Sequence, residues 1–293
     1  MGIQNNIWQT HRFDFDKIPD YIKTPINSWM NTNTNFNYTY MSTDDKNDFM
    51  SSFESSELRK IFFSKEINAI HKADMWRVAI VYAYGGFYAD ADLMCIESID
   101  DMTQNNMDSV VASIDNSLIK NPTTVFELFD KSSTELITNK FSGEFTGNTI
   151  SSNQFFGAVK NSYFLEIVIT NMISKCTSFL ESNTSASQWR FSRFITAEDV
   201  GPGVFDAALA EIFKDKNINL AKKVTLFPDS AKYINICGSK TWNDFPLTQN
   251  RADSIRSIIS QSREDDYSAE KETANAGCLK IITSDGHGRA SYG

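Results

Sequence analysis

The stretch 67–92 constrains the fold of this chain more than any other part of its sequence. Apolar residues recur there at intervals of three and four, which predicts a helix with one apolar stripe. Gly85 and Gly86 are expected to end this helix, because glycine accepts the left-handed backbone that a helix C-terminus needs. A short strand over 87–89 then leads directly into an Asp-Ala-Asp triplet.

The carboxylates of this triplet are predicted to lie side by side. In an extended chain, residues two apart point to the same face, so Asp90 and Asp92 should be aimed one way. Two such carboxylates repel each other unless a cation lies between them or water solvates both. Asp74 and Arg77 are three apart on the preceding helix and share a face, for which a surface salt bridge is the simpler alternative to a functional role.

These elements, taken in order, resemble the sugar-transferase signature of glycosyltransferase family 32. The family pattern reads roughly as Ser-Asp-x-x-Arg on a helix, then Tyr-Gly-Gly-x-Tyr, then Asp-x-Asp. In this chain it stands as Ala73-Asp74-Met75-Trp76-Arg77, Tyr84-Gly85-Gly86-Phe87-Tyr88 and Asp90-Ala91-Asp92. The match is specific because separated elements fall in order at the right spacing, whereas a lone Asp-x-Asp is close to noise.

The fold class predicted for the chain is α/β. Strands alternating with helices indicate a mixed, mostly parallel central sheet flanked by helices. The resemblance implies the GT-A fold of nucleotide-diphospho-sugar transferases, in one domain over residues 1–248. Residues 249–293 are rich in Ser, Asp, Glu, Arg and Gly, which is typical of a polar, flexible tail. The polar segment 116–150 is interpreted as an irregular insertion that shapes acceptor specificity.

The resemblance implies a metal-dependent glycosyltransferase. It would move a sugar, with retention of configuration, from a UDP- or GDP-sugar to a glycan, glycolipid or protein acceptor. Mn²⁺ or Mg²⁺ held by Asp90 and Asp92 would neutralise the departing diphosphate, and carboxylate oxygens suit these cations. The alternatives are a non-catalytic module that binds a nucleotide sugar or metal on a degenerate transferase fold, and a metal-dependent hydrolase.

The resemblance also assigns candidate site residues. The catalytic set is Asp74, Arg77, Asp90 and Asp92, and the donor-binding set is Trp8, Gln9, Asp74, Arg77, Gly86, Tyr88, Asp90, Asn153, Gly201 and Trp242. Asp74 would hydrogen-bond sugar hydroxyls, and Arg77 would hold the donor. No residue is named as a nucleophile, so front-face and double displacement both stay open.

Several of these residues have simpler structural interpretations. Trp8 either stacks on the nucleotide base or packs in the core. Asn153 either faces the donor or holds a turn, and Tyr88 either lines the pocket or packs. Gly201 precedes a helix whose free N–H groups favour anions, but it fits a plain helix start equally well. Trp242 belongs to a closing segment in which the histidine of the family pattern is missing, which leaves a third protein ligand to the metal open.

Composition excludes some classes of function. The formal net charge of −9 argues against broad nucleic-acid binding, which needs a basic face. The four cysteines are scattered and show no ligand spacing, which is typical of reduced thiols rather than of zinc or disulfides. No signal peptide and no membrane-length apolar run of about 20 residues is seen, so a cytoplasmic protein of bacterial or viral type is expected.

Overall fold

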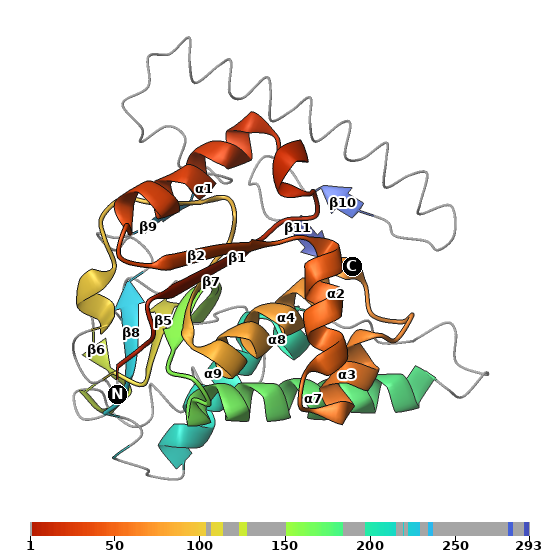
Figure 1. Cartoon of the computed structure of the whole chain (residues 1–293). Helices are drawn as coiled ribbons and strands as arrows, with labels where there is room; N and C mark the ends of the chain where they lie inside the picture. The colour runs from red at the N-terminus through yellow and green to blue at the C-terminus, as the bar shows by residue number, and fades with distance from the viewer. Residues whose placement is uncertain are drawn as a thin grey trace.

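The computed structural model describes much of the N-terminal part of the chain and shorter pieces beyond it. The described residues are 2–103, 107–113, 123–127, 151–183, 197–214, 219, 222–228, 234–236, 281–283 and 290–292. Within them, one central sheet carries helices on both faces (Figure 1).

The central sheet has the strand order β2-β1-β3-β7-β5-β8-β6. Its strands are β1 (Asn6–Thr10), β2 (Asn37–Met41), β3 (Gly86–Ala89), β5 (Ser109–Ser113), β6 (Thr123–Thr124), β7 (Ser151–Ala158) and β8 (Val224–Pro228). Two smaller antiparallel pairs join β4 (Leu93–Cys95) to β9 (Ile234–Ile236) and β10 (Ile281–Thr283) to β11 (Ala290–Tyr292).

Most strands of the central sheet run in one direction. β1 is parallel to β2 and β3, and β5 is parallel to β8. β7 lies between these two groups and is antiparallel to β3 and β5, while β6 is antiparallel to β8. The predicted fold class, α/β with a mixed, mostly parallel central sheet flanked by helices, is therefore confirmed.

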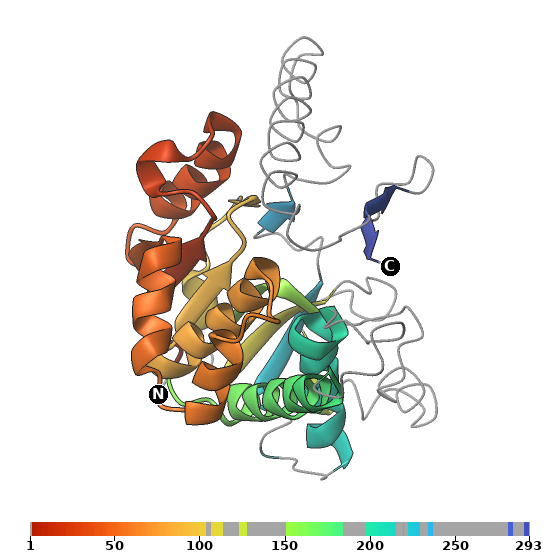
Figure 2. The ribbon, with the colours of Figure 1, turned by 90° about the vertical axis from the view of Figure 1, so that its right-hand side faces the viewer.

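Helices cover the sheet unequally. They are α1 (Asp20–Thr32), α2 (Thr43–Ser52), α3 (Ser56–Phe62), α4 (Ala69–Tyr84), α7 (Tyr163–Asn183), α8 (Ala197–Val200) and α9 (Pro202–Lys214), with short 3-10 turns η1 (Phe15–Lys17) and η2 (Asp100–Thr103). Figures 1 and 2 show α4, α7 and α9 together on one face and α1 on the other. Trp29 of α1 stacks on Phe155 of β7 at 5.6 Å between ring centroids, which closes the core on that second face.

The central motif forms the predicted helix, glycine turn and strand, but the predicted single apolar stripe is wrong. All residues from Asp74 to Val81 are buried, because the helix is covered on several sides, whereas Ile70 is exposed. Asn68 caps α4, since its side chain accepts the backbone N–H of His71. The helix ends at Gly85 (φ +71°), and Gly86 (φ +104°) begins β3. Both glycines therefore occupy the left-handed region that side chains disfavour.

One helix was not expected from the sequence. α2 follows β2 directly, and its N-terminus is a capping box in which Ser42 and Asp45 bond each other's backbone N–H. Most of the polar segment 116–150 and of the tail 249–293 lies outside the described residues, so the domain boundary stays a prediction.

No helix in the described part of the chain is both long enough and apolar enough to span a bilayer.

Gly86→Ala should destabilise the protein. A Cβ at this position would lie 2.5 Å from the carbonyl oxygen of Asn6. Alanine would also have to adopt a positive φ, which residues with a side chain disfavour. The expected loss is at least ~2 kcal/mol in the free energy of unfolding, measured by urea denaturation. Gly203→Ala, in the first turn of α9, is the matched control and should leave stability unchanged or higher. Equal midpoints for Gly86→Ala and the parent protein would contradict this account.

Candidate active site

The candidate site lies where the carboxyl ends of β1 and β3 meet the first residues of β7. Ligands of such sheets bind at this edge, because loops converge there. The backbone N–H of Asp90, the residue after β3, donates to the carbonyl of Gln154 at 2.8 Å. The first acid of the Asp-x-Asp motif is thus attached to the neighbouring strand.

The expectation that Asp90 and Asp92 lie in one extended strand is wrong. The backbone N–H of Leu93 donates to the carbonyl of Asp90 at 3.0 Å, which closes a tight turn. This turn takes the chain out of the central sheet and into β4, so the two acids do not share a strand face. Their carboxylates are still electrostatically coupled, since the charge of Asp92 raises the pKa of Asp90.

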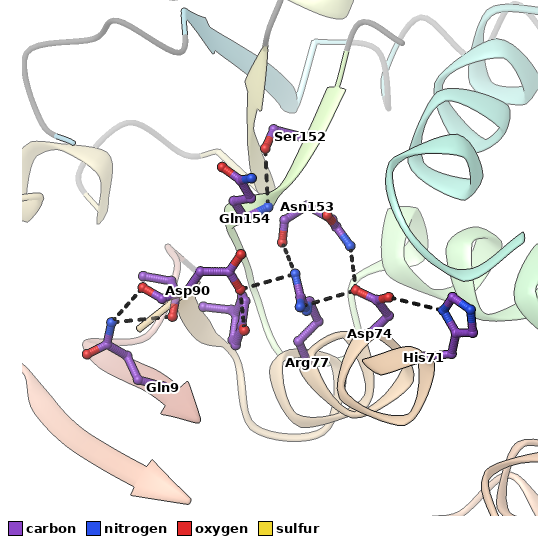
Figure 3. A network of polar contacts seen from close by, with 10 residues as sticks. Gln9, His71, Asp74, Arg77, Asp90, Ser152, Asn153 and Gln154 are labelled. Carbon is purple, nitrogen blue, oxygen red and sulfur yellow. Dashed lines mark hydrogen bonds and ion pairs between the residues drawn. The ribbon is translucent and has the colours of Figure 1, made fainter. Parts of the chain in front are cut away.

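Asp74 and Arg77 of α4 take part in a buried polar network (Figure 3). Arg77 donates through Nη2 to Oδ1 of Asp74 at 3.1 Å and through Nη1 to Oδ1 of Asp90 at 3.2 Å. Asn153 of β7 accepts from Arg77 Nη1 at its carbonyl (3.0 Å) and donates its amide to Asp74 (2.9 Å). One guanidinium thereby joins a helix, a turn and a strand.

The surface salt bridge considered for Asp74 and Arg77 does not describe this pair. Asp74 is 6% exposed and Arg77 is 8% exposed. A buried ion pair is weak evidence for stability as such, but removing one partner leaves an uncompensated charge in a low dielectric. The pair therefore ties the position of Asp90 to the integrity of α4.

Tyr88 of β3 is also part of the network. Its hydroxyl donates to Oδ1 of Asp90 at 2.6 Å, and the guanidinium of Arg77 lies 4.7 Å from its ring centroid. Burial raises the pKa of Tyr88 well above its ordinary value, so the phenol stays a neutral donor at physiological pH. The sequence left open whether Tyr88 lines the pocket or packs in the core. Its ring is almost fully buried, which agrees with packing.

Burial also changes the acids themselves. It raises the pKa of Asp90 to about 6, against the opposing effect of Arg77. Burial raises the pKa of Asp92 as well, and this carboxylate makes no ion pair within the described residues. Burial alone would lower the pKa of Arg77, but Asp90 and its neighbours raise it overall. Three carboxylates, those of Asp74, Asp90 and Asp92, thus face one guanidinium, which leaves excess negative charge at the turn.

Gln9 anchors this turn from β1. Its side chain has no exposed surface, and Nε2 donates to the carbonyls of Ala89 (3.4 Å) and Asp90 (3.1 Å). Its Oε1 accepts the hydroxyl of Tyr38 at 2.9 Å. The described contacts of Gln9 therefore position the backbone of the acidic turn, and its predicted contact with a donor stays a prediction.

Gly86 and the indole of Trp8 lie at the other end of β3, although the backbone of Trp8 pairs with Tyr88. The indole N–H of Trp8 donates to the carbonyl of Gly85 at 2.9 Å, and its ring packs on Tyr84 at 5.8 Å. Gly86 is the first residue of β3, whereas Asp90 follows the last. The structure does not bring these two residues into the polar network, and their roles at the nucleotide stay predictions.

Of the remaining predicted site residues, one belongs to the network, one lies near the start of β7, and one is not described. Asn153 is part of the network. Gly201 is buried just before α9, and the hydroxyl of Ser151 donates to the Pro202 carbonyl at 3.1 Å, which places the start of α9 beside the start of β7. Trp242 lies outside the described residues, together with most of its closing segment.

Sequence reasoning missed two contributors to the network. Nδ1 of His71 lies 3.7 Å from Oδ2 of Asp74, and the i,i+3 spacing of these two residues is the signal that could have found it. The carbonyl of Gln154 holds the N–H of Asp90. This backbone contact depends on the register of β7 against β3, for which the sequence carries no signal.

Asp90 and Asp92 fit a hard divalent cation in charge and in donor type. Oδ2 of Asp90 has no hydrogen-bond partner among the described residues, and the side chain is 23% exposed. Within those residues no group of three or more His, Cys, Asp or Glu side chains is arranged to hold a metal. A cation here would therefore need further oxygen ligands from water or from a bound phosphate, which Mg²⁺ commonly has.

Comparisons with known proteins agree with the sequence motif. Residues 19–111 match the family model described as "Glycosyltransferase sugar-binding region containing DXD motif". This segment contains the whole polar network except its β7 residues. Membership of glycosyltransferase family 32 itself stays a prediction. No curated protein matches the chain.

Several solved structures are distantly similar to this chain in their backbone fold. The ligand-free glycosyltransferase domain of the YGT toxin has a TM-score of 0.46 and 11% identity, over 90% of this chain and 91% of that one. The catalytic domain of alpha-toxin from Clostridium novyi has a TM-score of 0.42 and 11% identity, over 87% and 82%. The PaToxG glycosyltransferase has a TM-score of 0.41 and 14% identity, over 75% and 76%. Likeness this distant says nothing about substrate or activity.

Arg77→Met should destabilise the fold strongly, because it leaves Asp74 and Asp90 buried without their cation. The expected loss is about 3–5 kcal/mol in the free energy of unfolding, measured by urea denaturation. Arg12→Met is the control, since Arg12 is exposed, and it should change stability by no more than about 0.5 kcal/mol. A loss below ~1 kcal/mol for Arg77→Met would show that the network is not the anchor described here.

Proposed function

We propose that this chain is a metal-dependent glycosyltransferase that moves a sugar from a nucleotide-sugar donor to an acceptor. One observation carries the proposal: the buried Asp74–Arg77–Asp90 network lies inside the segment that matches a DXD sugar-binding region. Such a network fixes one acid of the motif at a sheet edge where ligands bind. Charged groups that are already in position can stabilise the negative charge that develops on a departing diphosphate.

The cation in this proposal is Mn²⁺ or Mg²⁺, held by Asp90 and Asp92. When bound, it neutralises negative charge on the departing diphosphate. The protein's own contribution is to hold the acids: Arg77 and Tyr88 occupy Oδ1 of Asp90, which leaves Oδ2 for a ligand. Asp92 has no competing ion pair in the described part of the chain.

Asp74 is proposed to receive sugar hydroxyls. Its Oδ1 is occupied by Arg77 and Asn153, while within the described ranges Oδ2 lies 3.7 Å from Nδ1 of His71. A carboxylate oxygen with spare lone pairs accepts hydroxyl donors well. In this scheme Arg77 acts on the donor mainly by holding Asp74 and Asp90, because Nη1 and Nη2 are bound to protein oxygens, while Nε has no acceptor among the described residues.

The finer parts of the proposal follow the family resemblance. The donor is a UDP- or GDP-sugar, the acceptor is a glycan, a glycolipid or a protein, and transfer retains configuration. A panel of UDP- and GDP-sugars with Mn²⁺ identifies the donor by hydrolysis. The anomeric form of the first product, followed by NMR, separates retention from inversion.

Asp90→Asn and Asp92→Asn should each lower donor turnover by on the order of 100-fold or more, since a bound metal supplies several kcal/mol of charge stabilisation. Turnover is measured as release of nucleoside diphosphate, with Mn²⁺ and with a chelator. Asp48→Asn, an exposed residue of α2, is the control and should retain full activity.

The same assay separates the alternative functions. Tight nucleotide binding by the parent protein, without turnover of any donor, would contradict the proposed transferase activity and favour a non-catalytic binding module. Hydrolysis of unrelated phosphoesters would favour a metal-dependent hydrolase. Undiminished turnover in both acid variants would show that the metal site is elsewhere.

Mn²⁺ affinity should fall as the pH is lowered through about 6. Burial raises the pKa of Asp90 to about 6, so protons compete with the cation for this carboxylate below that pH. Affinity is expected to be constant above pH 7 and to fall up to about tenfold per pH unit below pH 6. Isothermal titration calorimetry from pH 8 to pH 5, with thermal unfolding at each pH to check folding, measures this. A flat profile would mean that Asp90 does not bind the ion.

A further inference from the structure

Lys46 is a buried cation that the polar network does not use. It lies in the first turn of α2, is 8% exposed, and packs its ammonium 5.9 Å from the ring centroid of Trp76. Among the described residues its ammonium makes no hydrogen bond or ion pair. Burying an unpaired charge is costly, so such a lysine calls for an explanation.

The surroundings of Lys46 do not compensate its charge. Burial, followed by repulsion from Arg77, lowers the pKa of Lys46 to about 8. Burial, Arg12 and Lys46 together lower the pKa of His11 to about 4. Lys46 is therefore still mostly protonated at neutral pH, within the field of a second cation and beside a neutral histidine. The region has donors and positive charge, and an anion would complete it.

Two other donors, both on α4, also have no acceptor among the described residues. Nε1 of Trp76 and Nε of Arg77 are buried and make no hydrogen bond in the described part of the chain. Buried polar groups are nearly always bonded, so each such group indicates a bound molecule or water. Trp76 and Arg77 are consecutive residues of α4, and Lys46 packs against the first of them.

Lys46 belongs to the same edge of the sheet as the acids. β2 is parallel to β1 and ends at Met41, whose carbonyl accepts the hydroxyl of Thr10 at 2.6 Å. α2 starts directly after this end. A chain of contacts continues inward, because Trp76 packs edge-on against Tyr88 at 6.1 Å and Tyr88 bonds Asp90.

We propose that Lys46 forms an anion subsite that binds a phosphate group of the nucleoside diphosphate donor and product. This inference rests on the proposed function. A phosphate group offers acceptor oxygens only, which suits a set of donors without acceptors. A diphosphate has enough oxygens to bind a divalent cation with some of them and an ammonium with others. An acceptor carboxylate would lack this second role.

The test measures binding of inorganic pyrophosphate, UDP, GDP and the matching nucleosides, with Mn²⁺ present, by isothermal titration calorimetry. Lys46→Met should weaken pyrophosphate and diphosphate binding by about tenfold or more, since charge-assisted bonds are the strong ones. Nucleoside affinity should not change, and Lys46→Arg should retain most of the affinity. Thermal stability of Lys46→Met should equal or exceed that of the parent protein, because an unpaired buried charge is removed.

Lys72→Met is the matched control. Lys72 also packs its ammonium on a ring, that of Phe62 at 5.8 Å, but its side chain makes no contact with the network that the structure describes. Its substitution should leave pyrophosphate affinity unchanged. An equal loss in both variants would indicate a general charge effect and would overturn the subsite.

The outcomes separate this inference from the proposed function. Unchanged pyrophosphate affinity in Lys46→Met, in a protein that still turns over its donor, would overturn the subsite alone. Pyrophosphate binding that depends on Lys46, in a protein with no transferase activity, would support the subsite and contradict the proposed function. Absence of pyrophosphate binding to the parent protein would overturn the subsite whatever the activity.

Discussion

The structure of the candidate site depends on one buried guanidinium. Arg77 compensates Asp74 on its own helix and Asp90 after β3, and it also binds a backbone carbonyl of β7. Without this cation, the two carboxylates would be buried with neutral hydrogen-bond partners but no compensating positive charge, which is costly in a low dielectric. The position of the acidic turn is therefore set by electrostatics inside the protein, before any ligand arrives.

β7 is what brings these groups together across the sequence. It runs antiparallel between β3 and β5, and this direction places its first residues at the edge where β3 ends. Asn153 and Gln154 can then hold Asp74 and Asp90 from the far side. A parallel strand in the same place would bring its opposite end to this edge.

Much of the fold could be predicted from the sequence, because its signals are local. The apolar periodicity of α4 and the two glycines after it each predict their element without reference to the rest of the chain. The Asp-x-x-Arg spacing identified the two network residues on α4, although it favoured a surface pair as the simpler alternative.

The remaining features depend on contacts between distant segments. The turn after Asp90 leaves the sheet because β4 pairs with β9, more than 130 residues later. Gln9 and Lys46 become buried only through the pairing of β1 with β3 and the packing of α2 on α4. α2 itself has few apolar residues, and its capping box is a weak signal compared with the periodicity of α4.

The direct passage from α4 into β3 has a consequence for the motions of the site. Only Gly85 separates the helix from the strand, and no loop intervenes between Arg77 and Asp90. Helix, glycine and strand therefore behave as one stiff segment, and little backbone freedom is left to lose when a ligand binds. A ligand at this candidate site would therefore meet side chains whose supporting backbone is already in position, which lowers the entropic cost of binding.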